Sequence, residues 1–197
     1  MASMPTHVAL LRGINVGGKN KVAMADLRAV VGELGHTAVS TYINSGNVLF
    51  TASMSAPGPG DDIDAMAQAM SAAIGAKLGI TTPVVIVPRD ELAEILAANP
   101  FLAEPDPKRV HAVFLSAPAG PGLLAKIDAA VAAAAAKGAR DSVRPAGRAL
   151  YLHTPDGFGT SDVSAALMRM VGGLKPPVVG TARNWATATK LLSLCDA

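Results

Sequence analysis

Short apolar runs alternate with amphipathic stretches along the first hundred residues of the chain. Residues 7–12 contain a continuous apolar run that Gly13 closes, which is typical of a buried strand. Apolar residues between Met24 and Leu34 recur at three- and four-residue spacing, and they predict an amphipathic helix that Gly35 ends. The same reasoning predicts further strands at residues 37–43, 47–50 and 83–87, and further helices at residues 63–78 and 90–98.

The order of elements recurs after a proline-rich connection at residues 99–108. Strand–helix–strand twice over is the split arrangement of ferredoxin-like sheets. We therefore expect an α+β fold of two ferredoxin-like (βαββαβ) halves, residues 1–100 and 108–197, each a sheet covered by helices, with a C-terminal helix. In the second half the pattern predicts strands at residues 110–115, 142–144, 149–153 and 177–179, and helices at residues 123–137, 161–171 and 181–194.

The composition excludes several classes of protein. Half of the residues are hydrophobic and 16% are charged, which supplies a buried core and argues against intrinsic disorder. No apolar run approaches the roughly 20 residues that cross a bilayer. The first residues also lack the basic and apolar regions of an export signal. We therefore expect a cytoplasmic protein that has no membrane partner.

The sequence carries no pattern of a common cofactor or metal site. Cys195 is the single cysteine, which excludes a disulfide framework and a cysteine-rich metal cluster. Gly157 and Gly159 lack the third glycine of a dinucleotide-binding loop. No histidines, cysteines or carboxylates share the spacing of metal ligands. The sequence thus predicts no cofactor and no metal.

Charged side chains are unevenly spread, although the net charge is only +2. Residues 51–106 carry a net charge of −6, whereas residues 1–50 and 107–197 carry +2 and +6. A protein that coats nucleic acid has a stronger and more continuous basic bias. The pattern therefore indicates local basic patches toward the two ends of the chain.

A glycine-rich loop follows the first expected strand. The segment GINVGGK at residues 13–19 has the spacing GxxxxGK of a phosphate-binding loop, in which backbone N–H groups and a lysine surround an anion. Asn20 stands where a Ser or Thr would bind magnesium. The next helix is expected to begin near Ala23, too late for its N-terminus to face the phosphates. An NTPase is therefore disfavoured, while an anion-binding loop and a purely structural glycine connection both stay open. The candidate ligand-binding residues here are Arg12, Asn15, Gly17, Gly18 and Lys19.

A second candidate lies at the expected turn that contains Asn44, Ser45 and Asn47. The simpler interpretation is a hairpin turn, because Asn and Gly tolerate positive φ. In the alternative, Ser45 and the two asparagine amides line a pocket near the glycine loop. As a nucleophile, Ser45 would need a general base, and the four scattered histidines offer no evident partner. The sequence therefore identifies no catalytic residue, and Asn44, Ser45 and Asn47 are candidate ligand-binding residues.

The last expected helix carries a polar stripe. At 100° per residue, Arg183, Thr187 and Lys190 share one sector and Trp185 lies on the roughly opposite side. The helix should therefore bury Trp185 and expose Arg183 and Lys190. An arginine near a helix start opposes the helix dipole, which points to a ligand or an acidic partner, although a solvated charged face is the ordinary explanation. Arg183, Asn184 and Lys190 complete the candidate ligand-binding residues.

Three separated motifs resemble the bacterial domain-of-unknown-function 1697 family. They are LLRGINVGGKNK at residues 10–21, TYINSGN at residues 41–47, and TARNW at residues 181–185 with TKLL at residues 189–192. The resemblance implies an α+β protein with a duplicated ferredoxin-like arrangement, and it brings no established activity, substrate or cofactor. It also implies a lysine where this chain has Asp162. If that lysine helps to bind an anion, this chain lacks part of the site.

Three functions follow from these candidates. In the first, the glycine loop with Lys19 and Lys21, the turn at residues 44–47, and Arg183 with Lys190 converge on one concave surface. This surface binds the phosphate of a nucleotide or a nucleic acid without catalysis. In the second, the chain is an enzyme that acts on a small phosphorylated or carboxylated metabolite, with Ser45 or His153 reacting. In the third, the motifs only stabilise the contact between the two halves. The sequence favours the first function, because no tuned base is evident for the second. The expected partner is thus a phosphate-bearing small molecule or a nucleic acid.

Overall fold

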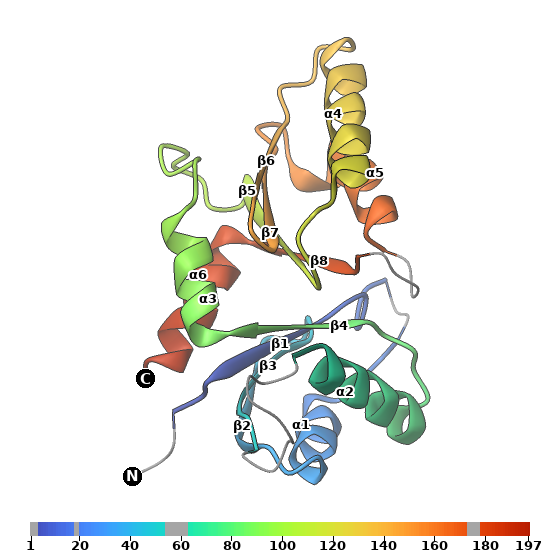
Figure 1. The fold of residues 1–197 in the computed structure, drawn as a ribbon, viewed down its shortest axis with the longest axis vertical. Helices are drawn as coiled ribbons and strands as arrows, with labels where there is room; N and C mark the ends of the chain where they lie inside the picture. The colour runs from blue at the N-terminus through green and yellow to red at the C-terminus, as the bar shows by residue number, and fades with distance from the viewer. Residues whose placement is uncertain (1–3, 18–19, 54–62, 173–177) are drawn as a thin grey trace. The chain divides into compact units, whose positions relative to one another are not determined.

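The computed structural model describes residues 4–17, 20–53, 63–172 and 178–197 (Figure 1). The chain divides into two compact units, residues 1–92 with 191–197 and residues 93–190. Each unit contains a four-stranded antiparallel sheet, and the strands follow the same spatial order in both sheets. The prediction of an α+β fold with two ferredoxin-like halves and a C-terminal helix is confirmed.

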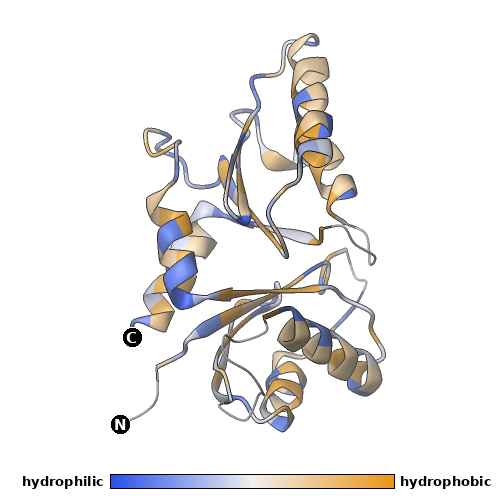
Figure 2. Cartoon of the chain, in the orientation of Figure 1, coloured by the Kyte–Doolittle hydropathy of each residue, from blue (hydrophilic) through white to orange (hydrophobic). Residues whose placement is uncertain are grey.

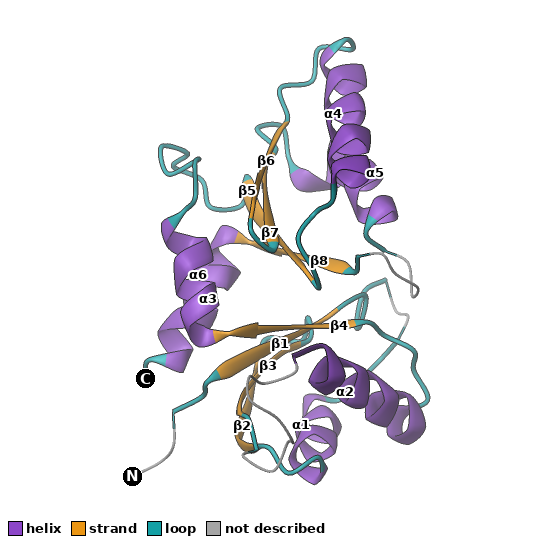
Figure 3. Ribbon diagram, viewed as in Figure 1, coloured by secondary structure: helices purple, strands orange, loops and turns teal. Residues whose placement is uncertain are grey.

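In the first unit, helices α1 and α2 cover one face of the sheet (Figures 1 and 3). The central strand β1 pairs with β3 on one side and with β4 on the other, and β2 lies beyond β3 at the sheet edge. The bounds are β1 (His7–Leu11), α1 (Met24–Glu33), β2 (Thr37–Tyr42), β3 (Asn47–Thr51), α2 (Ile63–Leu78) and β4 (Val84–Pro88).

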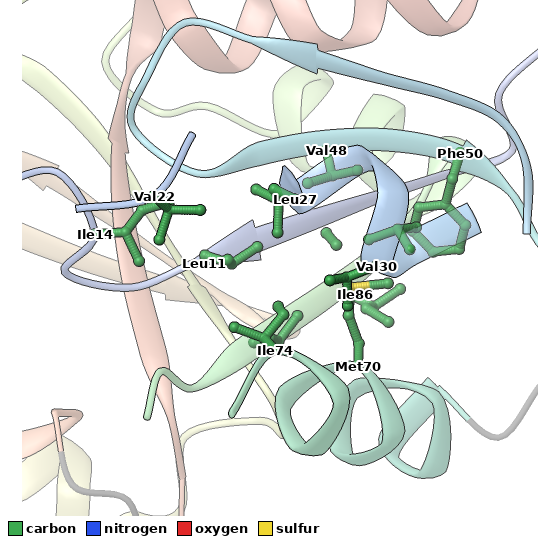
Figure 4. Packing of buried hydrophobic residues seen from close by; sticks show 13 residues of the cluster. Leu11, Ile14, Val22, Leu27, Val30, Val48, Phe50, Met70, Ile74 and Ile86 are labelled. Carbon is green, nitrogen blue, oxygen red and sulfur yellow. The ribbon is translucent and has the colours of Figure 1, made fainter. Parts of the chain in front are cut away.

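Alternate residues of these strands face the two helices and form the core of the first unit. Along a strand, successive side chains point to opposite faces, so Ala9 and Leu11 share the face on which the helices pack. Helix α1 contributes apolar residues at helical spacing, as its mixed colouring in Figure 2 shows. The side chains drawn in Figure 4 show this packing, with Leu11, Ile14, Val48, Phe50 and Ile86 from the sheet side and Leu27, Val30, Met70 and Ile74 from the helices.

The second unit repeats the arrangement. Strand β5 is central, between β7 and β8, and β6 lies beyond β7. Helices α4 and α5 contribute to a core with Val113, Leu115, Leu150 and Leu152 of the sheet. The bounds are β5 (Val110–Leu115), α4 (Pro121–Ala135), β6 (Ser142–Ala146), β7 (Ala149–His153), α5 (Asp162–Met170) and β8 (Gly180–Asn184), with a short 3₁₀ turn at Phe158–Thr160.

Two further helices are α3 (Arg89–Ala97) and α6 (Trp185–Cys195). The expected helix at residues 181–194 is wrong over its first four positions, because residues 180–184 pair with β5 as strand β8. The strand expected at residues 177–179 is likewise displaced: residues 178 and 179 are not in a strand, and residue 177 lies outside the described residues. In the described ranges, no helix is both long enough and apolar enough to cross a membrane.

Candidate functional site

The side chain of Asn15 organises the glycine loop. Its Nδ2 donates hydrogen bonds to the carbonyl oxygens of Val22 (3.0 Å) and Asn44 (2.9 Å). Its Oδ1 accepts a hydrogen bond from the Val22 N–H (2.8 Å). The amide therefore closes the loop at Val22 and joins it to the turn between β2 and β3. Asn15, predicted as a ligand-binding residue, uses both of its N–H donors inside the protein.

Left-handed backbone conformations give this loop its path. Gly13 and Gly17 have φ of +67° and +58°, and Asn15 and Asn20 have φ of +54° and +48°. Glycine and asparagine are the residues that adopt this region most readily. Asn20 also donates from Nδ2 to the Gly13 carbonyl (3.0 Å), so a second side chain holds the loop closed. Gly18 and Lys19 lie outside the described residues.

The segment between β2 and β3 is a turn at residues 43–46, as the simpler interpretation predicts. Gly46 has φ +79°, and a Cβ at this position would lie 2.8 Å from Leu11 Cβ, so both the backbone and the space require glycine. Asn47 is fully buried and donates from Nδ2 to the Tyr42 carbonyl (3.0 Å) and to Ser45 Oγ (2.9 Å). Asn47 and Ser45 therefore hold the turn together.

A hollow of about 550 Å³ opens beside these two loops. Lys21 is exposed and makes no ion pair with any residue the structure describes. The exposed side chain of Asn44 likewise has no hydrogen bond within the described parts of the chain. A cation and an amide are thus available to a ligand here. The lining consists of Asn15, Lys21, Val22, Ala23, Met24 and Asn44.

The first residues of α1 form one side of this hollow. Helix α1 begins at Met24, close to the predicted start. That start was expected to be too late for the helix N-terminus to face a phosphate, but Ala23 and Met24 line the hollow. No side chain caps the helix at Ala23, and its first intrahelical bond runs from Leu27 N–H to the Ala23 carbonyl. The backbone N–H groups of residues 24–26, in the first turn of α1, are therefore available to an acceptor. Asp26 in the first turn opposes an incoming anion.

Arg12 lies at the end of β1, where the main chain is tied to the segment before β4. Its N–H donates to the Pro83 carbonyl (3.1 Å), and its carbonyl accepts from Thr82 Oγ1 (2.7 Å). The side chain is half-buried, and this burial lowers the pKa of the guanidinium. Arg12, predicted as a ligand-binding residue, does not line the hollow.

The predicted exposure of Arg183 is wrong. Arg183 lies in β8 opposite Ala112, its exposed fraction is 8%, and burial lowers the pKa of its guanidinium to about 10. One of its terminal nitrogens donates to Thr181 Oγ1 (2.8 Å) and to the Ala182 carbonyl (2.8 Å). Because residues 180–184 are a strand, Arg183 shares no helical stripe with Lys190.

The other two predicted residues near the C-terminus have different surroundings. Asn184 caps α6, because its Oδ1 accepts a hydrogen bond from the Thr187 N–H (2.8 Å). Lys190 is exposed as predicted, and Trp185 is half-buried. These residues belong to the second unit, whereas the loop and turn residues belong to the first. A crevice shared by both sets stays a prediction.

His153 forms a close pair with Glu104 that the sequence did not predict. Its Nε2 lies 2.8 Å from Glu104 Oε2, and its ring stacks on Phe101 with centroids 5.1 Å apart. The Glu104 side chain is only 12% exposed. The hydrogen bond from His153, and a second from the Asp106 N–H, hold the pKa of the Glu104 carboxyl below its usual value. The two residues lie 49 positions apart, so no local spacing could reveal the pair.

Two further hollows are less suited to an anion. One, of about 350 Å³ in the second unit, contains Lys137 and Asp162 paired at 3.4 Å together with Asp141 and Asp156, so carboxylates dominate it. The other, of about 400 Å³ in the first unit, includes Cys195, and burial raises the pKa of this thiol to about 11. In the described ranges, no three His, Cys, Asp or Glu side chains are arranged to hold a metal ion.

Comparison with known proteins finds a family that includes the glycine loop, but it finds no activity. The model of a family described as protein of unknown function, DUF1697, matches residues 4–151. A solved structure of a conserved bacterial protein from Streptococcus pneumoniae is similar, with a TM-score of 0.61 and 23% identity, covering 98% of this chain and 99% of that chain. At this identity the likeness concerns the fold alone. No curated protein matches the chain. The family match includes the glycine loop and the turn, and it ends before Arg183.

Proposed function

The chain belongs to the DUF1697 family of proteins of unknown function, and from the geometry of its glycine loop we propose that the first unit is a non-catalytic binding module. The ligand is the phosphate of a nucleotide or of a nucleic acid. The single observation that carries this proposal is the hollow at which Lys21, Asn44 and the uncapped start of α1 meet.

The available groups are donors of the kind that phosphate oxygens accept. Lys21 supplies an ammonium group, Asn44 supplies an amide, and the first turn of α1 supplies backbone N–H groups at the positive end of the helix dipole. Hydrogen bonds to an ionised acceptor are stronger than bonds between neutral groups. A dianionic phosphate should therefore bind more tightly at this position than a neutral ligand.

The charges beside the hollow limit the affinity. Asp26 lies in the first turn of α1, exposed to solvent, and its carboxylate repels an anion at the helix start. Lys21 is likewise exposed, so salt screens its attraction for a phosphate. We therefore expect binding that is weak, that saturates, and that is lost as the salt concentration rises.

Ser45 and His153, the two side chains that the enzyme alternative would use, favour binding over a reaction. Ser45 Oγ accepts a hydrogen bond from the Asn47 amide, which is a donor and cannot remove a proton from the hydroxyl. His153 belongs to the second unit, where Glu104 and Phe101 hold its ring. The hollow itself is lined by no histidine or carboxylate among the described residues. A binding module is therefore the function that these side chains support best.

The proposal is tested by titrating inorganic phosphate into the full chain at low ionic strength, with binding measured by calorimetry. We expect Lys21→Gln to weaken binding about tenfold, because it removes a charge-assisted hydrogen bond. Asp26→Asn should strengthen binding, because it removes the opposing charge. Lys126→Gln is the matched control, since Lys126 is an exposed lysine of the second unit. Absence of saturable phosphate binding, or an equal loss in Lys126→Gln, would contradict the proposal.

A further inference from the structure

The hollow beside the glycine loop is much larger than a phosphate group requires. Its volume of about 550 Å³ falls within the range of roughly 300–1,000 Å³ that is typical of sites for whole organic ligands. We propose that it binds a complete mononucleotide, whose phosphate lies at Lys21 and whose base lies against the exposed aliphatic side chains of Val16 and Ile43. This inference rests on the proposed function and names the class of ligand.

Val16 and Ile43 are unusually exposed for large aliphatic residues. Their exposed fractions are 64% and 49%, and they are two of the four large hydrophobic residues that are exposed in the part of the chain that the structure describes. Each is the chain neighbour of an asparagine that lines the hollow, Val16 of Asn15 and Ile43 of Asn44. The hydrogen bond from Asn15 Nδ2 to the Asn44 carbonyl (2.9 Å) joins the two chain segments that carry these aliphatic residues.

Ile43 also occupies a backbone conformation that isoleucine rarely adopts. Its φ is +48°, in the left-handed region where a β-branched side chain is strained and asparagine is tolerated. Solvent exposure gives an isoleucine no compensating burial at this position. A contact with the apolar face of a ligand would supply that burial, and a nucleobase offers such a face beside the phosphate that Lys21 attracts.

The charges near the hollow favour a mononucleotide over a nucleic acid. Among the described residues of the loop and α1, Lys21 and Arg28 are balanced by Asp26 and Glu33. A strand of nucleic acid requires neutralisation of several successive phosphates. The described lining also contains no aromatic side chain on which successive bases could stack. One phosphate and one base therefore match what the surface offers.

The experiment compares three ligands on the full chain: adenosine 5′-monophosphate, ribose 5-phosphate and inorganic phosphate. We expect the mononucleotide to bind about tenfold more tightly than inorganic phosphate, because burial of one aliphatic contact supplies this difference. Ribose 5-phosphate, which has no base, should bind like inorganic phosphate. A twelve-residue oligothymidylate is the fourth ligand, titrated at two salt concentrations.

The variants are Val16→Ser and Ile43→Asn, with Leu102→Ser as the matched control. Asparagine tolerates positive φ, so Ile43→Asn should fold at least as well as the natural chain. Leu102 is an exposed aliphatic residue of the second unit, with an exposed fraction of 71%. The first two variants should reduce the tenfold preference for the mononucleotide to near equality with inorganic phosphate, whereas Leu102→Ser should leave it unchanged.

The outcomes separate this inference from the proposed function. If phosphate and the mononucleotide bind equally, or if Val16→Ser and Ile43→Asn leave the preference intact, the inference is overturned while phosphate binding stands. Tighter, strongly salt-dependent binding of the oligothymidylate would replace the mononucleotide with a nucleic acid. If none of the four ligands binds, both the inference and the proposed function are overturned.

Discussion

Asn15 and Asn44, which lie 29 positions apart, are joined by a hydrogen bond of 2.9 Å from the Asn15 side-chain amide to the Asn44 carbonyl. This bond connects the glycine loop to the turn between β2 and β3, and both residues line the same hollow. The proposed ligand site therefore depends on a side chain that itself has no free donor for the ligand.

Replacement of Asn15 should destabilise the chain more than replacement of Asn20. Both residues have positive φ, and glycine can adopt the same backbone conformation at each position. Asn15→Gly removes three side-chain hydrogen bonds, whereas Asn20→Gly removes one. At about 1 kcal/mol for each bond, we expect losses of about 3 and about 1 kcal/mol in the free energy of unfolding. Urea denaturation measures both, and equal losses would show that the Asn15 contacts do not hold the loop.

Gly46→Ala should be far more damaging than Gly17→Ala. Both glycines have positive φ, but an added Cβ at Gly46 would lie 2.8 Å from Leu11 Cβ, whereas at Gly17 nothing lies within 4 Å. The left-handed conformation costs about 1–2 kcal/mol for alanine in either case. Overpacking adds about 1–3 kcal/mol at Gly46 alone. Thermal melting of the two variants checks this, and similar melting temperatures would mean that the turn and Leu11 move apart easily.

His111 should make the chain less stable in mild acid. Burial lowers the pKa of its imidazole to about 4, and its buried Nδ1 has no hydrogen-bond partner among the described residues. An unfolded chain binds this proton near pH 6.5, so stability falls as the pH drops from 6.5 toward 4, by about 2 kcal/mol at pH 5.

His111→Phe is the variant that isolates this effect. Phenylalanine keeps the stacking on Phe158, whose ring centroid lies 4.1 Å from that of His111, and it has no proton to bind. We expect a gain of about 1 kcal/mol at pH 7, because the unpaired nitrogen is removed, and a flatter dependence of unfolding free energy on pH between 7 and 5. Parallel pH profiles for the two proteins would contradict this assignment.

Glu104 should hold the connection between α3 and β5 in place. Its pKa is lowered by the hydrogen bond to His153 and by the Asp106 N–H, so the interaction is present above about pH 4.5 and is lost as the pH falls through the lowered value. At pH 7, Glu104→Gln should speed hydrogen exchange at residues 99–109. Glu94→Gln, which alters an exposed carboxylate of α3, should not. Unchanged exchange in Glu104→Gln would show that Phe101 alone fixes His153.

Local pattern predicted most of the fold because the strands and helices of both units carry clear periodicity. Val110–Leu115 and Ala149–His153 have the predicted bounds, and α1 begins at Met24 where the apolar spacing begins. Strand β8 was missed because GTARN has little β-branched character, while residues 178 and 179 are valines. Its pairing with β5, which places Thr181 opposite Phe114, is a tertiary contact that no local pattern records.

The candidate site was predicted in part, for reasons that differ between residues. Asn15 was predicted from the phosphate-loop spacing and Asn44 from turn chemistry, and the structure brings them to one hollow. Lys21 was expected to add charge to the surface of the glycine loop but was not among the candidate ligand-binding residues, because nothing in the sequence distinguishes it from other exposed lysines. Arg183 was expected to be exposed because charged residues are mostly found at the surface, but as part of β8 it is buried and donates to Thr181 and Ala182.

The most direct test of the phosphate site is an amide NMR titration of the full, isotopically labelled chain with inorganic phosphate at low salt. We expect saturable chemical-shift changes at the N–H groups of residues 20–26 and at the Asn44 side-chain amide, with one shared dissociation constant that Lys21→Gln increases. Shifts that never saturate, or that cluster in the second unit and leave residues 20–26 unmoved, would contradict it.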